Sequence, residues 1–553
     1  MDIFQIFALL GGLALFLCGM EMMGDALKKL SGSKLETILE KLTSHPLKGV
    51  LLGLGVTAVI QSSSATTVMV VGFVNSGIMQ LEQAVGVIMG ANIGTTVTSW
   101  ILSLTGIQGE SLLLRLLKPS SFSPLLAFIG IILTMFCKSE KKKDTGTILL
   151  GFAILMTGME AMSDAVAPLA DVPEFANLMT FFTNPIMGLL AGAILTAIIQ
   201  SSSASVGILQ ALCATGAISY SVALPVIMGQ NIGTCVTALI SAIGANRNSK
   251  RAALIHLYFN LIGTTVFMIL FYAIHAFVQF PFMTDSANAA GIAVIHSSFN
   301  VFATCLLLPF NKILVKLARL TLPDLPESET DSMVQDNPVL ALLDERFLEK
   351  PAYALTRAKS VSVSITEDVL FMSQTVYPML GAYEKGDAKQ ALAMSEDIAE
   401  EIKYLHDYLV KISSAPLTEE DNYLVNHLLQ SAGYINGITA NLVAMAQTAK
   451  SLHKGKVPLT ETAKKELDEL WNSTSVLLQC MTRFYTDEPV FPAQWMSDQQ
   501  QATQKQIKAL KKSHIKRLKD GKCNAKTGMH FLNLLTECEQ ITFHATTLMS
   551  ESI

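Results

Sequence analysis

Two matching polar interruptions within apolar sequence constrain this chain more than any other feature. Gln-Ser-Ser-Ser occurs at Gln61–Ser64 and again at Gln200–Ser203, each time inside a strongly apolar stretch. In lipid an unsatisfied polar group is costly, so a run of hydroxyls there needs a specific reason. The same offset of 139 residues relates further motifs, Gly19-Met20-Glu21 to Gly158-Met159-Glu160 and Asn92-Ile93-Gly94-Thr95 to Asn231-Ile232-Gly233-Thr234. The sequence therefore predicts a duplicated membrane unit of the kind from which many transporters are built.

The chain divides into an apolar part and a more charged part. Half of its 553 residues are hydrophobic, but beyond about residue 321 no apolar run approaches the ~20 residues that span a bilayer. We expect an all-α protein with a polytopic membrane domain over 1–317, a linker over 318–339 and a helical domain over 340–553. The eight cysteines include no Cys-x-x-Cys pair, and the net charge of −5 predicts no nucleic-acid partner.

Eleven apolar segments fill the membrane domain, and four of them are short. Those flanking the serine triplets, 46–61, 65–79, 185–200 and 204–218, have about 15 residues each and favour two re-entrant hairpins that turn at the serines. The other seven should cross: 3–24, 81–105, 123–137, 145–168, 222–244, 251–278 and 289–317. Repeat 1 then covers about 3–137, repeat 2 about 145–278, and 289–317 is an extra span.

Loop charge predicts the orientation in the membrane. Lys and Arg concentrate in 25–45, 138–144, 245–251 and after 311, whereas 169–184 and 279–288 contain none. Seven crossings with the N-terminus outside place all basic loops and the C-terminal domain in the cytoplasm. The first apolar segment lacks a basic region before it and is expected to be a retained span. Because each repeat has three crossings, an odd number, the second copy enters the membrane inverted relative to the first. Hairpins that crossed the membrane completely would also leave an odd number of crossings, so the loop charges support inversion of the repeats but do not show that the hairpins are re-entrant.

The residue types at the hairpin turns suit an oxyanion and a cation. Helix N-termini offer unpaired N–H groups and a positive dipole end, and the hydroxyls add rotatable donors. Gln61 and Gln200 contribute amides that both donate and accept, and the remaining oxygens suit Na⁺. Fixed positive charge near these motifs is sparse, so a dianion would need co-bound cations. The alternative is that the hydroxyls only mediate helix packing, which two matched copies make the less favoured interpretation.

Further polar residues in the apolar segments leave more alternatives open. Glycines on both sides of Asn92 and Asn231 predict local helix unwinding that would expose carbonyls to ions, although the amides could instead bridge helices. His256 with Asn260, and His296 with Asn300, recur at an offset of 40; we favour hydrogen bonding between helices over a proton relay. The acidic residues Glu21, Asp25, Glu160 and Asp164 are expected at the membrane interface rather than buried.

These motifs resemble the type II sodium-dependent phosphate cotransporters, in particular bacterial Na/Pi-cotransporter proteins with a C-terminal PhoU-like domain. The resemblance covers roughly 1–317 and implies a symporter, not an enzyme, that imports inorganic phosphate with Na⁺ across the cytoplasmic membrane, without a cofactor or bound metal. It implies that phosphate is bound by Gln61, Ser62, Ser63, Ser64, Gln200, Ser201, Ser202 and Ser203. Sodium would be bound by Ser64, Thr66, Asn92, Thr95, Thr96, Ser203, Asn231 and Thr234. Thr96 becomes Cys235 in the second copy, so the two halves need not bind the same ions.

The C-terminal part reads as long amphipathic helices, enough for two three-helix bundles. The segments Gly433–Gly437 and Glu539–Phe543 stand where PhoU proteins carry metal-binding acids, and most of those acids are missing here. The cluster Glu396, Asp397, Glu400 and Glu401 is expected to be a solvated face. We therefore expect regulation of transport, or docking to a phosphate-signalling protein, and a homodimer as a further partner. Phosphate export, transport of another oxyanion, and a membrane phosphate sensor remain the alternative functions; no catalytic motif favours an enzyme.

Overall fold

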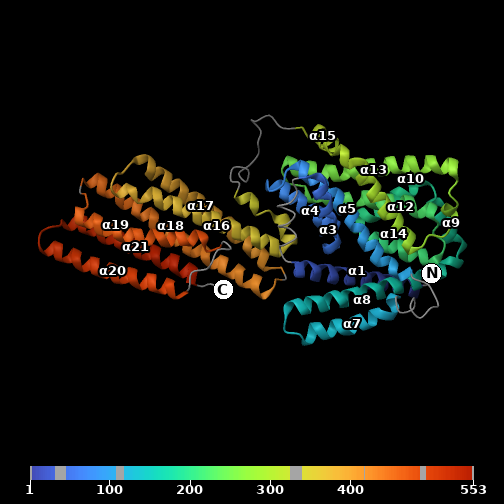
Figure 1. Cartoon of the computed structure of the whole chain (residues 1–553), viewed down its shortest axis with the longest axis horizontal. Helices are drawn as coiled ribbons and strands as arrows, with labels where there is room; N and C mark the ends of the chain where they lie inside the picture. Colours follow the sequence, from blue (N-terminus) through green and yellow to red (C-terminus); the bar gives the residue numbers. More distant parts are fainter. Residues whose placement is uncertain are drawn as a thin grey trace. The chain divides into compact units, whose positions relative to one another are not determined.

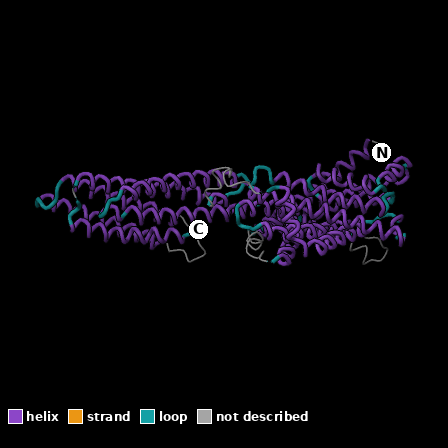
Figure 2. Tube along the Cα trace, turned by 90° about the horizontal axis from the view of Figure 1, so that it is seen from above, coloured by secondary structure: helices purple, strands orange, loops and turns teal. Residues whose placement is uncertain are grey.

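The computed structural model describes residues 3–31, 45–106, 118–323, 339–415, 417–456, 458–485 and 493–550. Across these ranges the regular structure is helical, and the only β pairing is an isolated bridge between Ser219 and Ser286 (Figure 2). The all-α expectation is confirmed. The chain forms two compact units, Met1–Ser332 and Met333–Ile553, which are described separately. Residues 324–338 of the predicted linker lie outside the described ranges.

The first unit contains the apolar helices. They are α1 (Ile3–Ser31), α3 (Pro46–Ile60), α4 (Ser63–Asn75), α5 (Leu81–Ser103), α7 (Pro119–Phe136), α8 (Glu140–Val166), α9 (Pro173–Phe181), α10 (Pro185–Ile199), α11 (Ser202–Leu212), α12 (Tyr220–Ser241), α13 (Arg247–Val278), α14 (Ala289–Leu307) and α15 (Asn311–Thr321) (Figure 1). Six helical stretches among the described residues are long and apolar enough to cross a membrane. The helix α7, a predicted crossing, falls among the shorter apolar helices, so its crossing stays a prediction.

Each serine triplet joins two helices that are too short to cross a bilayer. The helices α3, α4, α10 and α11 have 15, 13, 15 and 11 residues. At 1.5 Å per residue none exceeds roughly 23 Å, below the ~30 Å of a hydrocarbon core. Helix α3 ends at Gln61 and α10 ends at Gln200, both in the left-handed conformation with φ of 61° and 58°. The helix breaks therefore lie at the predicted positions in both copies.

The helices α1 and α8 pack against each other in antiparallel directions (Figure 1). Glycines on each helix lie against the partner's backbone or side chains, and the contacts are Gly12 with Met162, Gly19 with Leu155, Gly151 with Met23 and Gly158 with Phe16. Residue numbers rise along one helix as they fall along the other. The 139-residue offset converts the Gly12–Met162 contact into the Gly151–Met23 contact, and the Gly19–Leu155 contact into the Gly158–Phe16 contact. Such reciprocal contacts define an approximate two-fold axis between the copies. Inverted repeats require such an antiparallel arrangement, and the inversion of the two copies in the membrane stays a prediction.

The predicted unwinding at Asn92 and Asn231 is wrong. Both α5 and α12 run as unbroken α-helix through these asparagines. The neighbouring glycines instead allow α3 to pack closely against α5, and α10 to pack closely against α12. A Cβ on Gly90 would lie 2.0 Å from the carbonyl oxygen of Val50, and one on Gly229 would lie 1.9 Å from that of Leu189. Glycine is needed here for helix contact rather than for backbone bending.

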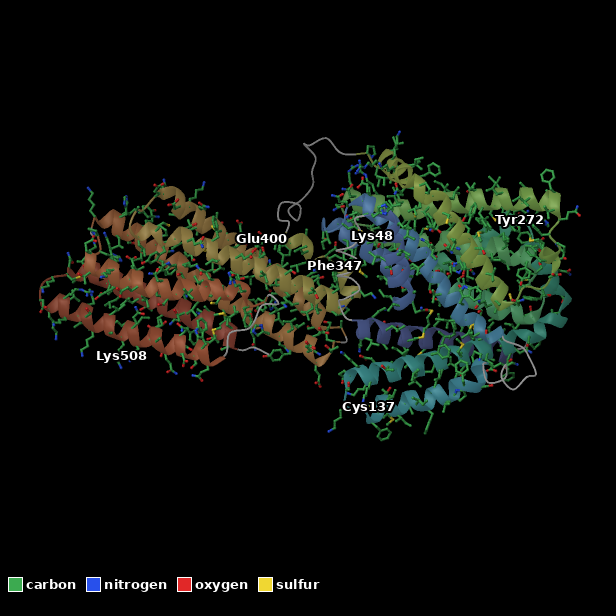
Figure 3. All side chains as sticks on the ribbon, viewed as in Figure 1. Lys48, Cys137, Tyr272, Phe347, Glu400 and Lys508 are labelled. Atoms are coloured by element: carbon green, nitrogen blue, oxygen red, sulfur yellow. The ribbon has the colours of Figure 1, made fainter. Side chains whose placement is uncertain are left out.

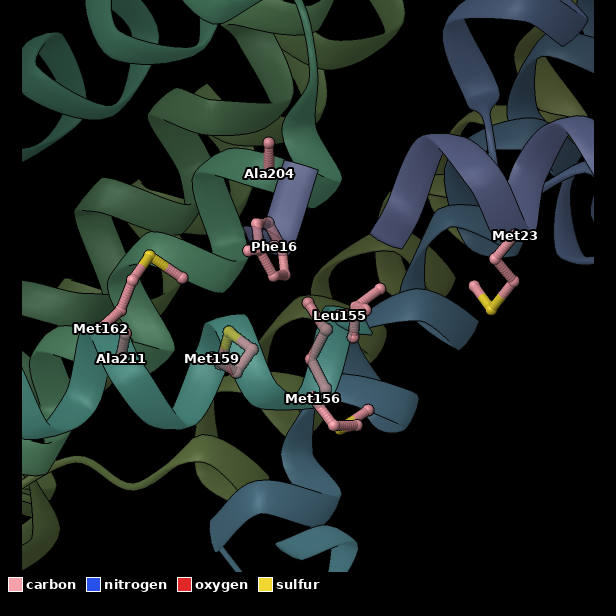
Figure 4. Close-up of a cluster of buried hydrophobic side chains, with 9 residues drawn as sticks. Phe16, Met23, Leu155, Met156, Met159, Met162, Ala204 and Ala211 are labelled. Carbon is pink, nitrogen blue, oxygen red and sulfur yellow. The ribbon is translucent and has the colours of Figure 1, made fainter. Parts of the chain in front are cut away.

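A buried apolar cluster joins α1, α5, α8 and α11 (Figure 4). Its members are Phe16, Met23, Leu102, Leu155, Met156, Met159, Met162, Ala204 and Ala211. The fully buried ring of Phe16 packs on Gly207, where an added Cβ would lie 2.5 Å from the ring. This contact seats α11, whose first residues belong to the second serine triplet, against α1 and α8.

Hydrogen bonds group the loops at two ends of the first unit. At one end Asn246 bonds to Asn75, and Arg319 pairs with Glu82 at 2.9 Å. At the other end the hydroxyl of Ser286 donates to the carbonyl of Gly216. Since α5 and α13 run from one group to the other, the residues joined by these bonds lie at the ends that the predicted topology assigns to them. Which end faces the cytoplasm stays a prediction.

The described residues of the second unit include six long helices. They are α16 (Pro351–Val376), α17 (Lys385–Ser413), α18 (Glu419–Gly455), α19 (Glu461–Arg483), α20 (Ala493–Lys519) and α21 (Ala525–Ser550). The helices α16, α17 and α18 contact one another, as do α19, α20 and α21, and the two sets meet through α18 and α21. Glu400 and Lys508 are exposed on the outer surface of this unit (Figure 3). The likeness to PhoU proteins stays a prediction.

Candidate functional site

The two serine triplets line one cavity of about 420 Å³. Its walls come from the ends of α3 and α10, the starts of α4 and α11, and one side of α1. All eight residues predicted for phosphate border it: Gln61, Ser62, Ser63, Ser64, Gln200, Ser201, Ser202 and Ser203. The tertiary structure thus brings together two motifs that lie 139 residues apart in sequence.

The backbone at each turn prepares a helix N-terminus for an anion. Ser62 is the N-cap of α4 and its Oγ accepts from the N–H of Ala65 at 3.1 Å; Ser201 does the same for Ala204 at 3.2 Å. Serine is a favoured N-cap because its hydroxyl replaces one missing intrahelical acceptor. The other N–H groups of the first turn have no acceptor within their helix. Two such N-termini at one cavity make an anion site chemically reasonable.

Gln61 is held by bonds that sequence reasoning did not foresee. The Oγ1 of Thr98 on α5 donates to Oε1 of Gln61 at 2.8 Å, and Nε2 of Gln61 donates to the carbonyl of Ala58. A glutamine in the left-handed conformation carries a local strain of about 1 kcal/mol, which the surrounding contacts must offset. Thr98 is therefore a positioning residue whose only signal in the sequence is a polar side chain in an apolar helix.

Three charged side chains of α1 also line the cavity. Glu21 and Asp25 are exposed to it, and the Nζ of Lys28 lies 2.7 Å from Oδ1 of Asp25. Fixed positive charge near the motifs was expected to be sparse, and Lys28 is the single cationic side chain among the residues that line the cavity. In repeat 2 the position equivalent to Lys28 is Ala167, so this charge belongs to one half only. Sequence reasoning assigned the lysine to a loop because it could not place α1 beside the hairpins.

Of the residues predicted for sodium, Ser64 and Ser203 line the cavity. The other six, Thr66, Asn92, Thr95, Thr96, Asn231 and Thr234, are buried but do not border it. Their side chains donate to nearby backbone carbonyls, as in the 3.1 Å bond from Thr95 to Ala91 and the 2.9 Å bond from Thr234 to Gln230. A hydroxyl that donates keeps acceptor capacity, so a role for these oxygens near an ion stays a proposal.

His296 links three helices through hydrogen bonds. Its Nδ1 lies 2.7 Å from Oγ of Ser99 on α5, and its Nε2 lies 3.4 Å from Oδ1 of Asn231 on α12. Since an amide oxygen only accepts, Nε2 must carry the proton and Nδ1 must accept from Ser99. Asn300 also donates to Oδ1 of Asn231 at 3.4 Å. For His296 this is the interhelical role that was favoured for both histidines, and it directs the oxygen of Asn231 toward α14. For His256 that role is wrong, because both of its buried ring nitrogens lack a hydrogen-bond partner among the described residues.

The two copies differ beneath their matching turns. In repeat 1 the hydroxyl of Thr57 donates to that of Thr66 at 3.0 Å. In repeat 2 the equivalent oxygens, those of Thr196 and Ser205, are buried without a hydrogen-bond partner among the described residues. The two copies therefore place equivalent serines at the cavity, but the hydrogen bonds between the helices beneath those serines differ.

In the second unit Gly433–Gly437 and Glu539–Phe543, the segments compared above with PhoU proteins, lie on α18 and α21, which pack together. Gly437 leaves room for the ring of His544, whose Nε2 would lie 2.6 Å from an added Cβ. Burial lowers the pKa of His544. Among the described residues no group of three or more His, Cys, Asp or Glu side chains is arranged to hold a metal ion.

The first unit is similar in sequence to known membrane transport proteins. The profile of the Na⁺/Pi-cotransporter family matches residues 15–164 and 154–284, two overlapping stretches within the first unit. An uncharacterized protein, YqeW of Bacillus subtilis, is 32% identical over 309 residues, covering 56% of this chain and 95% of that protein. No solved structure matches.

Two further relatives carry functional names. The "Putative inorganic phosphate export protein YjbB" of Salmonella typhimurium is 25% identical over 87% of this chain and 85% of its own length. "Sodium-dependent phosphate transport protein 2A" of Rattus norvegicus is 24% identical over 46% of this chain and 59% of its own length. With its duplicated hairpins, its shared cavity and these matches, the chain belongs to the Na⁺/Pi-cotransporter family, a family of transporters rather than enzymes.

Proposed function

We propose that this protein is a sodium-coupled secondary transporter of inorganic phosphate, and that phosphate binds in the cavity between the two serine triplets. The observation that carries the proposal is that all eight Gln and Ser residues of the repeated motif border one cavity of about 420 Å³. Two helix N-termini and up to six hydroxyls can donate to the oxygens of a tetrahedral anion.

The charge of the cavity supports coupling to a cation. Glu21, Asp25 and Lys28 together contribute a formal charge of −1, and dianionic phosphate would make the occupied site strongly negative. Like charges in a partly desolvated site repel, so co-bound cations are needed to offset them. Na⁺ favours oxygen ligands, and the carboxylates of Glu21 and Asp25 join Ser64 and Ser203 as candidates.

The antiparallel packing of α1 and α8 supports alternating access by inverted repeats. An approximate two-fold axis between the repeats allows one arrangement to open the cavity to one side, and the arrangement in which the repeats exchange conformations to open it to the other. Helix α13, the last helix of predicted repeat 2, contacts α4 and α5 of repeat 1 as well as α12 of its own repeat. It would therefore take part in any movement of one repeat against the other.

Inward movement of phosphate is the direction we propose. A symporter follows the combined gradients of its substrates, so an inward sodium gradient drives phosphate inward. Export is the second candidate, because the YjbB relative named for phosphate export covers most of this chain. Where the sodium gradient points inward, it opposes the exit of sodium together with phosphate. Export therefore requires that phosphate leave without coupling to sodium. The two readings therefore differ in their response to sodium.

Radiolabelled phosphate flux in proteoliposomes tests the proposal. Uptake should rise when sodium is higher outside, and should collapse when choline replaces sodium or when the gradient is dissipated. Efflux from phosphate-loaded vesicles that ignores sodium would favour the export candidate. Flux that follows a proton gradient alone would overturn sodium coupling. Binding of phosphate without flux in either direction would favour a membrane sensor, and stronger flux of sulfate or arsenate would change the substrate.

The site itself is tested by matched substitutions in the two copies. Ser63→Val and Ser202→Val each place an apolar side chain at the cavity wall and should abolish phosphate flux. The control is Ser76→Val, at the far end of α4 from the cavity. Comparable protein levels and thermal melts would show that folding is intact. Normal flux in both cavity variants would refute the assignment of the site, whichever ion drives transport.

A further inference from the structure

The predicted last span, 289–317, is divided into two helices with different surroundings. Helix α14 ends at Leu307, a short 3₁₀ turn with Pro309 follows, and α15 begins at Asn311. The 19 residues of α14 extend roughly 28 Å, close to the thickness of a hydrocarbon core. Helix α15 therefore lies where α14 leaves the membrane, at the end of the unit that also holds Glu82 and Asn246.

One face of α15 is anchored to the membrane unit. Leu314, Val315 and Ala318 are at most 6% exposed and pack where α15 meets α5 and α13. After the helix, the guanidinium of Arg251 donates to the carbonyl of Leu322 at 2.9 and 2.7 Å. The helix is held in place by these contacts, so its other faces are presented in a defined direction.

The second face of α15 is basic and borders a cavity. Lys312, Lys316 and Arg319 lie at spacings of four and three residues, which places them on one side of the helix. With Glu82, Val315 and Leu320 they line a cavity of about 420 Å³. Among the described residues, Arg319 alone of the three has a carboxylate partner, Glu82, and the residues that line the cavity carry a formal charge of +2. The site is thus built for an anion.

The third face of α15 is apolar and exposed. Phe310, at the end of the preceding 3₁₀ turn, and Ile313 and Leu320 of α15 are 51%, 52% and 68% exposed and lie beside the basic face. An apolar stripe next to a basic stripe is the pattern of a helix that lies in the membrane interface, with its apolar side chains among the acyl chains. The basic side chains then lie at the depth of the lipid phosphates.

We propose that α15 is an interfacial helix and that the cavity beside Lys312, Lys316 and Arg319 binds the phosphate of an anionic phospholipid head group. The apolar stripe is the reason to prefer a lipid over free phosphate, because free phosphate offers nothing for Phe310, Ile313 and Leu320 to contact. The site lies apart from the cavity of the serine triplets and shares none of its lining residues. The proposal does not depend on the transport function.

The test is a lipid titration of the full-length protein in detergent, read by native mass spectrometry. Phosphatidylglycerol should bind more tightly than phosphatidylcholine. Lys312→Gln with Lys316→Gln should weaken phosphatidylglycerol binding by roughly fivefold for each ammonium removed. These side chains are exposed and do not form the anchored face, so the double variant should fold. The matched control is Lys141→Gln with Lys142→Gln, two exposed lysines at the start of α8, which should leave the affinity unchanged.

Other outcomes would overturn the proposal. Equal weakening in the control pair would show general charge attraction rather than a site. If phosphatidylcholine binds as tightly as phosphatidylglycerol, the lysines do not select the anionic head group. Displacement of the lipid by millimolar inorganic phosphate would identify a free-phosphate site instead. If the double variant binds as the unmodified protein does, the cavity holds no lipid phosphate.

Discussion

Replacing Gly90 by alanine should disturb the site without touching it. In the structure a Cβ at Gly90 would lie 2.0 Å from the carbonyl oxygen of Val50, whereas real contacts of this kind are not shorter than about 3.0 Å. Helices α3 and α5 must therefore separate by at least about 1 Å. Overpacking of this size costs about 1–3 kcal/mol. Because α3 ends at Gln61, the same movement displaces the turn that lines the cavity.

The assay combines thermal melting in detergent with phosphate flux in proteoliposomes. A displacement near 1 Å at a positioned group can lower a rate by as much as ~10²-fold, so flux should fall at least about tenfold even where protein remains folded. Gly55→Ala on α3 is the control, since nothing lies within 4 Å of its added Cβ. Gly229→Ala should repeat the effect in the second copy. Wild-type melting and flux in Gly90→Ala would refute the close approach of α3 and α5.

Three further predictions address charge, hydrogen bonding and pH. Lys28→Gln removes the ammonium from the serine cavity and should raise the phosphate KM in flux assays by roughly tenfold, whereas Lys48→Gln, on the exposed side of α3, should not. His296→Ala leaves Ser99 without its buried partner and should destabilise the protein by about 1–3 kcal/mol in denaturant titrations; no change would contradict the bridge. In the second unit, burial is the main cause that lowers the pKa of His514 below its ordinary value of 6.5. Unfolding then takes up a proton, so stability present above about pH 6.5 should be lost as the pH falls; hydrogen exchange of α20 should report this loss. His514→Gln should reduce the loss, and the remainder should come from His544, whose pKa burial also lowers.

Much of the membrane unit follows from local sequence because its signals are local. The short apolar segments and the polar turns at Gln61 and Gln200 predicted helix breaks that the structure shows at those residues. Serine caps and left-handed turns depend on a few neighbouring residues, so one stretch of sequence is enough to predict them. The repeat offset extended each prediction to the second copy.

Predictions that needed a partner helix succeeded less well. The glycines around Asn92 were expected to unwind α5, but they accommodate the backbone of α3, which the sequence alone could not place there. The last span was expected to be single, yet Pro309 divides it and leaves α15 anchored beside α13. The same glycine or proline can bend a helix, end it or allow close packing. Which of these occurs depends on the neighbouring helix, which the local sequence does not specify.

By itself the sequence determined that the chain is helical, membrane-embedded in its first part and duplicated, because composition and periodicity depend on the chain alone. It also singled out the two serine triplets. Only the tertiary structure decided that both triplets border one cavity, that Thr98 holds Gln61, and that Lys28 stands beside the serines. These contacts join α1, α3, α5, α10 and α11, and they depend on the antiparallel packing of α1 with α8. Residues far apart in a chain acquire a shared site only when packed helices bring them within a few ångströms of each other.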